Sequence, residues 1–247
     1  MSFAYAFASS YMGLAWESWV PYQSQLVATT FLFLSLGLWL TKKSYLGAGI
    51  GLGLAILARL FTATTSLFYL ILIWVGEGKL KEKMKKGIAV LWPVFGALVI
   101  LGFYNWARFD SPLRDGYALQ ESYYGASVEQ RAKGWYRVEN IPTNFYYYFL
   151  KGVYPVTRGG DDYRLKFPFF AADPQGRGMS FLLTGPIFLF LLSRKPKGLV
   201  EVAAAVTAGV ITAMLFMFYI PGFWQHGARY LNDALPILFV WLCLIFK

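Results

Sequence analysis

The sequence has few of the residues on which metal and redox chemistry depend. Its 247 residues include one histidine, His226, and one cysteine, Cys243. These two side chains cannot make a zinc site, and one cysteine cannot form an intrachain disulfide. The sequence also lacks a Gly-x-Ser-x-Gly elbow and a Walker motif, so redox and NTP-driven chemistry have no support.

Charged residues are also scarce. They make up 15% of the chain, against 57% hydrophobic and 19% aromatic residues. The mean hydropathy is +0.46. Because the apolar residues come in long blocks, the composition indicates a polytopic membrane protein. The net charge of +10 lies largely in short lysine-rich connectors between these blocks, which argues against a nucleic-acid partner.

The apolar blocks predict an all-α fold, a polytopic transmembrane bundle of about eight segments with one external, partly helical loop. The segments are residues 3–19, 24–40, 44–58, 61–76, 87–106, 178–193, 199–220 and 230–246. Several are near the shortest length that crosses a hydrocarbon core of about 30 Å. The expected regions are helices one to five in residues 1–106, an external lid in 107–177, and helices six to eight in 178–247.

The cationic connectors predict the orientation. They lie between alternate segments: Lys42–Lys43, Lys79–Lys86, Arg194–Lys197 and, after the last segment, Lys247. If successive segments alternate in direction, all four lie on one side, which the positive-inside rule makes cytoplasmic. We therefore expect a multi-pass protein of the cytoplasmic (plasma) membrane, with residues 107–177 outside the cell.

Two local patterns refine this picture. In the third segment, the pairs Gly47/Gly51 and Gly49/Gly53 have the spacing that lets transmembrane helices approach closely. In the external region, prolines and glycines predict turns with a few short helices. One of these helices is expected over Ile141–Gly152.

The stretch Gly222–Pro236, GFWQHGARYLNDALP, holds the strongest site candidates. If the chain is helical from Tyr230 onward, His226, Arg229 and Asp233 fall within an arc of roughly 60°. The proline that ends the stretch would then lie in the second turn of that helix. Ionisable groups at a membrane boundary are costly and are functional candidates by default, although an interfacial anchor would have the same composition.

Two arginines are expected at the external face, Arg59 at the end of the third segment and Arg229 before the eighth. Arginine binds phosphate oxygens bidentately, so the pair suits the phosphate of a lipid-linked substrate. The alternative is that each snorkels to the headgroups. The aromatic side chains of Trp224, Trp135 and Tyr146–Tyr148 are candidates for sugar stacking or for an interfacial belt.

External carboxylates are the candidates for acid–base chemistry. Glu17 lies between two tryptophans and could act as a general base or simply be solvated. Asp161 and Asp162 follow two glycines and could bind a cation, or they could be ordinary turn residues. No catalytic residue is assigned on these grounds, and Glu17 is the one weak candidate.

Four stretches resemble, in order, motifs of the GT-C membrane glycosyltransferases, a superfamily of enzymes like the dolichol-phosphate-mannose mannosyltransferases. GFWQHGARYLNDALPIL is similar to their late motif, and LGLAILARLFT to their glycine-rich helix that ends in an external arginine. YNWARFDSPLRDGY resembles the segment that enters their large external loop, and FPFFAADPQGRGMSFLLTGPIFLF the segment that leaves it. The similarity extends over nearly the whole chain.

This resemblance implies a transferase. Such enzymes are inverting and move a sugar from a polyprenyl-phosphate donor to a lipid, glycan or protein acceptor outside the cytoplasmic membrane. Their carboxylate base lies in a first external loop that corresponds to sequence upstream of Met1. The resemblance therefore leads us to expect the C-terminal part of such an enzyme in a cell-envelope pathway.

The resemblance also suggests roles for residues near the external face. Arg59 and Arg229 would hold the donor phosphate, while Gln225, His226 and Asp233 would orient Arg229 or the sugar. Trp224 would add to the same substrate-binding site. No nucleotide cofactor and no metal ligand are implied, and a requirement for a divalent cation is left open.

Two other classes fit part of the pattern. A transporter or flippase for a lipid-linked or anionic solute would carry charges deep within its helices and an inverted repeat. No repeat is visible, and Glu201, near the inner end of the seventh segment, is the main charge of that kind. A non-catalytic membrane subunit would also fit the lack of an assigned base.

Overall fold

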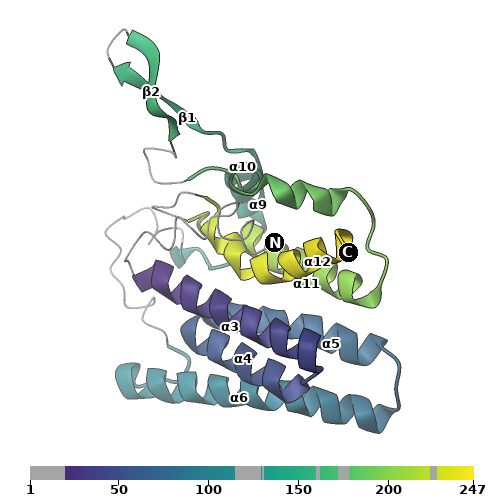
Figure 1. The fold of residues 1–247 in the computed structure, drawn as a ribbon. Coiled ribbons are helices and arrows are strands. Elements are labelled where there is room, and N and C mark those ends of the chain that lie inside the picture. The colour runs from purple at the N-terminus through teal and green to yellow at the C-terminus, as the bar shows by residue number, and fades with distance from the viewer. Residues whose placement is uncertain (1–19, 115–128, 130, 160–161, 172–177, 223–226) are drawn as a thin grey trace.

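The structure is a computed structural model that describes residues 20–114, 129, 131–159, 162–171, 178–222 and 227–247. The first half of the chain folds into helices that pack side by side, low in Figure 1. They are α3 (Val20–Lys42), α4 (Tyr45–Ala58), the 3-10 helix η1 (Leu60–Thr65), α5 (Ser66–Val75) and α6 (Leu80–Phe109).

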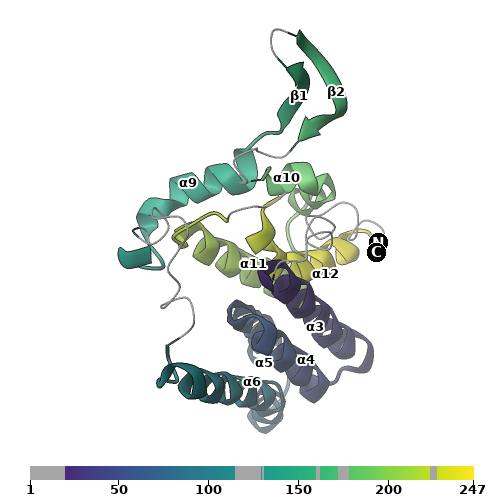
Figure 2. The same ribbon diagram turned by 90° about the vertical axis from the view of Figure 1, so that its left-hand side faces the viewer.

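The second half combines a short β-hairpin with further helices. The elements are the 3-10 helix η2 (Val138–Asn140), α9 (Ile141–Phe145), the π-helix η3 (Tyr146–Leu150), strands β1 (Tyr154–Gly159) and β2 (Asp162–Ala171), α10 (Phe181–Thr184), the 3-10 helix η4 (Pro186–Leu192), α11 (Leu199–Met217), the 3-10 helix η5 (Arg229–Asp233) and α12 (Leu235–Ile245). The antiparallel hairpin projects away from the helices in both ribbon views (Figures 1 and 2).

Three helices are long and apolar enough to cross a membrane: α3, α6 and α11. This indicates a multi-pass membrane protein, but the predicted count of about eight spans is wrong for the described residues. The other apolar runs form shorter helices. For example, the 11 residues of α12 rise only about 16 Å, roughly half of a hydrocarbon core.

The predicted glycine packing in α4 is confirmed. A Cβ atom on Gly49 would lie 2.6 Å from the carbonyl oxygen of Val90 in α6, and one on Gly51 would lie 2.8 Å from the Cα of Ser35 in α3. Larger residues would collide with these backbones, so glycine lets α4 lie directly between α3 and α6. Ser44 starts α4 by accepting a hydrogen bond from the Gly47 amide at 3.0 Å.

The cationic connectors gather at one end of the bundle, at the right of Figure 1, as alternation of the segments predicts. A Cβ atom on Gly76, shortly before Lys79, would lie 3.5 Å from Leu199 Cδ2 at the start of α11. Lys86 Nζ, near the start of α6, lies 5.6 Å from the ring centroid of Tyr45, the first residue of α4. Arg194 Nη2, before α11, donates to the Leu244 carbonyl near the end of α12 at 3.3 Å. We call this the lysine end of the bundle. The opposite end holds Arg59 and η5.

The region between α6 and α11 is only partly as predicted. The helix expected over Ile141–Gly152 is present as α9 and η3, which together run to Leu150. The hairpin is a structure that the sequence interpretation missed, since only turns and short helices were expected there. The apolar run 178–193 is broken by Gly185 and Pro186 into α10 and η4 and is not a single long helix.

Candidate functional site

A buried ion pair joins the end of α4 to η5. Arg59 Nε donates to Asp233 Oδ1 at 2.8 Å and to Oδ2 at 2.9 Å, across 174 positions of the sequence. The Arg59 side chain is 18% exposed and the Asp233 side chain only 2%. Arg59 stands in extended backbone between α4 and η1, so its side chain leaves the helix axis and reaches η5.

Burial and pairing act on Asp233 in opposite directions. Burial raises the pKa of its carboxyl, and the charge and hydrogen bonds of Arg59 lower it. A buried carboxylate of this kind keeps its charge only with its partner in place. The pair therefore fixes the position of η5, and with it the position of Arg229 at the start of that short helix.

Arg229 lies among aromatic rings beside this pair. Its residue is 9% exposed, and its Cζ lies 4.9 Å from the ring centroid of Tyr22 in α3 and 5.1 Å from that of Tyr230. Arg59 Cζ lies 5.3 Å from the same Tyr230 ring. Two guanidinium groups thus lie near one tyrosine ring, and cation–π attraction stabilises this arrangement.

Tyr148 of η3 adds a phenol to the cluster. The residue is fully buried, and its hydroxyl has no hydrogen-bond partner in the described part of the chain. Burial raises the pKa of Tyr148 well above its usual value, with a further contribution from Tyr230, while the charges of Arg59 and Arg229 oppose the shift. The phenol therefore keeps its proton and is a hydrogen-bond donor in the field of both arginines.

The α3 helix also carries a buried side-chain amide. Gln25 is one turn after Tyr22 on the buried face of that helix and is 1% exposed. Neither its Oε1 nor its Nε2 has a hydrogen-bond partner among the described residues. Buried polar atoms are normally paired, so this amide is a further candidate for contact with a polar ligand, one turn from Tyr22 on α3.

The segment after residue 131 is tied over this end of the bundle. Asn144 Nδ2 donates to the carbonyls of Leu215, Phe216 and Phe218 at 3.2, 2.9 and 2.7 Å, which satisfies the carbonyls that the end of α11 leaves open. Asn140 Nδ2 donates to the Met217 carbonyl at 3.0 Å. These bonds hold α9 and η3, and with them Tyr148, against the arginine cluster.

The structure brings together three of the predicted site residues, Arg59, Arg229 and Asp233. It corrects one detail, because the chain from Tyr230 onward is not one continuous helix. It forms η5 and then α12, which begins at Leu235 and has Pro236 in its first turn. Four other predicted site residues lie outside the described residues: Glu17, Trp224, Gln225 and His226.

The remaining candidates lie elsewhere or in a supporting position. Asp162 is the first residue of β2, in the hairpin that points away from the bundle (Figure 1), and Asp161 lies outside the described residues. Trp135 packs edge-on against Tyr219, with ring centroids 5.3 Å apart. No group of three His, Cys, Asp or Glu that could hold a metal ion occurs within the described ranges.

Sequence reasoning missed the tyrosines that frame the arginines. Tyr22 was part of an external connector, and Tyr230 was taken only as part of the late motif. Tyr148 was considered for sugar stacking, and its place next to the arginines was not foreseen. The usable signal was that aromatic residues recur in each segment expected at the Arg59 end of the bundle.

A second arginine–carboxylate pair occupies the lysine end. Arg194 Nη1 and Nη2 donate to Glu201 Oε2 and Oε1 at 2.6 and 2.9 Å. The backbone N–H of Lys197 donates to Glu201 Oε2 at 3.0 Å. Glu201, the charge that would have suited a transporter, is thus fully engaged by the connector before α11.

The chain matches no family model, no curated protein and no solved structure.

Proposed function

We propose that this chain binds the phosphate of a polyprenyl-phosphate-linked sugar and belongs to a membrane glycosyltransferase of the GT-C type. The observation that carries the proposal is the burial of Arg229 between the rings of Tyr22 and Tyr230, beside the Arg59–Asp233 pair. The acceptor of the sugar is a lipid, a glycan or a protein on the outer face of the cytoplasmic membrane.

The charge of the cluster favours an anionic ligand. Its described part contains two guanidinium groups and one carboxylate, and Asp233 is directed at Arg59. Arginine presents a planar fork that matches two phosphate oxygens, and it does so most strongly where water is excluded. We assign phosphate binding to Arg229, with Arg59 supplying further positive charge and Asp233 positioning Arg59.

The polar groups around the arginines suit a sugar phosphate more than a bare anion. The Tyr148 hydroxyl adds a hydrogen-bond donor in the field of both arginines, and the Gln25 amide adds a buried donor and acceptor one turn from Tyr22 on α3. Tyrosine faces also stack well on sugar rings. The ends of α3 and α4 that border the cluster belong to apolar helices, which suits a ligand with a long prenyl tail.

The orientation follows from the two ends of the bundle. The lysine end faces the cytoplasm by the positive-inside rule, so the arginine cluster faces the outside, where lipid-linked sugars are used. Transfer to an acceptor also needs a carboxylate base, for which Glu17 is the candidate named from the sequence. The resemblance to GT-C motifs adds the reaction class to what the site itself supports, which is recognition of a lipid-linked phosphate.

The proposal is tested by replacing Arg229 with lysine and measuring binding of a radiolabelled polyprenyl phosphate to purified protein in detergent. The change keeps the charge but removes the bidentate fork, so affinity should fall about tenfold to a hundredfold, the value of about 1.5–3 kcal/mol for such a hydrogen bond. Sugar transfer by the full-length protein, assayed with the polyprenyl-phosphate sugar, should fall in parallel.

The matched control is Arg108→Lys. Arg108 is exposed near the end of α6 on the same side of the bundle, and its guanidinium donates to the Tyr104 hydroxyl at 2.6 Å. This variant should bind polyprenyl phosphate as the unchanged protein does. Normal binding by the Arg229→Lys variant, or an equal loss in both variants, would refute the assignment of Arg229 to the phosphate.

A further inference from the structure

The lysines at the start of α6 divide into two groups. Lys83 Nζ donates to the Trp74 carbonyl at 2.9 Å, and Lys86 Nζ lies over the ring of Tyr45. Lys81 and Lys85 are exposed and have no hydrogen bond or ion pair within the part of the chain that the structure describes. The first two contribute to the fold, and the other two remain available to a ligand.

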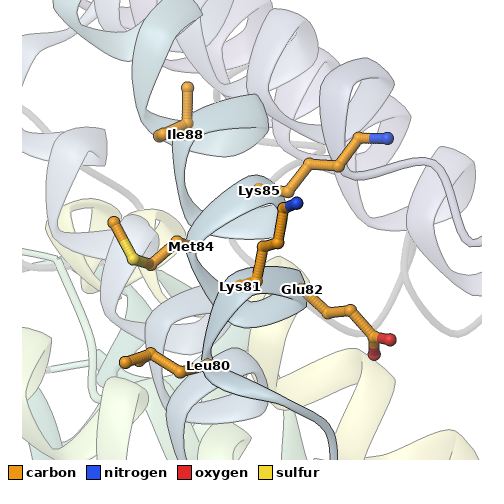
Figure 3. Close-up of a pocket in the computed structure, with 6 residues that line it drawn as sticks. All are labelled: Leu80, Lys81, Glu82, Met84, Lys85 and Ile88. Carbon is orange, nitrogen blue, oxygen red and sulfur yellow. The ribbon is translucent and has the colours of Figure 1, made fainter.

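The two available lysines border an apolar surface. Leu80, Met84 and Ile88 follow one another at intervals of four residues and form an exposed column along the helix. The ammonium groups of Lys81 and Lys85 lie to the right of this column in Figure 3. These residues line an open hollow of about 800 Å³. Glu82, which also lines it, directs its carboxylate toward the start of the helix and away from both ammonium groups (Figure 3).

The position of this surface along α6 determines how deep it lies in the membrane. At about 1.5 Å per residue, the 30 residues of α6 are longer than a hydrocarbon core of about 30 Å. If the apolar stretch from Gly87 fills the core, the preceding two turns lie among the headgroups of the cytoplasmic leaflet. Ile88 and Trp92, 63% and 68% exposed, continue the apolar column from those turns into the core.

We propose that the first two turns of α6 form a binding site for an anionic phospholipid of the cytoplasmic leaflet. Lys81 and Lys85 hold the headgroup phosphate, and an acyl chain lies along Met84, Ile88 and Trp92. Charge complementarity selects this occupant, because the site joins two unengaged cations to an apolar strip at headgroup depth. A second copy of the chain is disfavoured, since a symmetric contact would oppose the same lysines to one another. The proposal is independent of the function proposed for the arginine cluster.

The test compares phosphatidylglycerol with phosphatidylcholine carrying the same acyl chains. Each lipid is titrated onto the purified full chain in neutral detergent, and the bound lipid is counted by native mass spectrometry. A lysine near an anionic lipid contributes about fivefold in affinity, so the variant Lys81→Gln/Lys85→Gln should bind phosphatidylglycerol roughly 25-fold more weakly. Binding of phosphatidylcholine should be weak and unchanged.

The control variant is Lys195→Gln/Lys197→Gln, which removes the same charge at the same end of the bundle. It should alter phosphatidylglycerol affinity less than twofold. Equal binding of the two lipids by the unchanged protein, or an equal loss in both variants, would overturn the proposal. A photoreactive group in place of Met84 should give lipid adducts in phosphatidylglycerol vesicles, and adducts between two chains would contradict it.

Discussion

The two ends of α11 carry two arginine–carboxylate pairs that differ in their surroundings. At its start, Glu201 accepts from both nitrogens of the Arg194 fork and from a backbone amide, and the Arg194 and Glu201 side chains are 25% and 10% exposed. Beyond its other end, Asp233 pairs with Arg59 in a cluster that contains Arg229 as well, and the Arg59 and Asp233 side chains are 18% and 2% exposed. The same pairing occurs once with a carboxylate that its own connector binds three times, and once beside a second guanidinium group that lies against tyrosine rings.

This difference is why we propose the arginine cluster, and not the Arg194–Glu201 pair, as a binding site. A pair whose arginine is open to solvent is screened by water and contributes little to stability. Burying an arginine–carboxylate pair is costly, because desolvation can exceed the attraction that the pair recovers. Such a pair is therefore weak evidence for stability, and two arginines beside tyrosine rings suit an anionic ligand.

Labelling from outside the cell tests whether the two ends face opposite sides of the membrane, and the expected effect is all-or-none. In a Cys243→Ser background, Arg114→Cys, in the exposed turn after α6, should react with an impermeant maleimide on intact cells. Lys195→Cys, at the lysine end, should react only after permeabilisation. The reverse pattern would place the arginine cluster on the cytoplasmic side and would rule out an external donor site.

Removing the buried carboxylate should have the largest effect on stability. Asp233→Asn leaves Arg59 partly buried without its counter-charge, and breaking such a pair costs about 3–5 kcal/mol. The free energy of unfolding in detergent, measured by denaturant titration, should fall by that amount. Arg59→Met in the same background should recover part of the loss, because it removes the uncompensated charge.

The matched control for this change is Asp110→Asn. Asp110 is exposed and ends α6 in a left-handed conformation, with φ 54°, which asparagine also adopts readily. The same chemical change should shift the free energy of unfolding by about 0.5 kcal/mol or less. A similar small shift for Asp233→Asn would show that the buried pair is not important for the position of η5.

The long helices were predictable because an uninterrupted apolar run of about 20 residues has few other folds. The run 199–220 became α11 and the run 87–106 became most of α6, which extends further into the lysines. The run 44–58 became α4 with almost the expected bounds, but its 14 residues rise only about 21 Å, less than the thickness of a hydrocarbon core. The run 230–246 gave a shorter helix than expected, because Pro236 fits the first turn of α12 and that helix begins at Leu235.

The hairpin was missed because its signal is short-range and was interpreted as a turn. Residues 159–162, Gly-Gly-Asp-Asp, join two runs rich in aromatic and β-branched side chains, a pattern typical of a hairpin. The aromatic content of the region had been assigned to contacts with the membrane or a sugar. In the structure the two runs pair as antiparallel strands.

The site was predictable in location and not in its pairings. The alternation of segments was enough to put Arg59 and Arg229 at one end, because each follows or precedes an apolar run on that side. The choice of Arg59 as the partner of Asp233 depends on the extended backbone at Arg59 and on the 3-10 turn of η5. The positions of Tyr22 and Tyr148 beside the arginines depend on how α3 and η3 pack, and no local sequence pattern specifies that packing.

The most direct test measures how a polyprenyl phosphate changes the free energy of unfolding of three proteins, the unchanged chain, Arg194→Lys and Arg229→Lys. At a ligand concentration about 100 times the dissociation constant of the unchanged chain, binding should stabilise that chain and Arg194→Lys alike, by about 2.7 kcal/mol. Arg229→Lys should gain about 1.4 kcal/mol or less, as its weaker affinity requires. Equal stabilisation of all three, or a gain lost only in Arg194→Lys, would contradict the assignment of ligand binding to the arginine cluster.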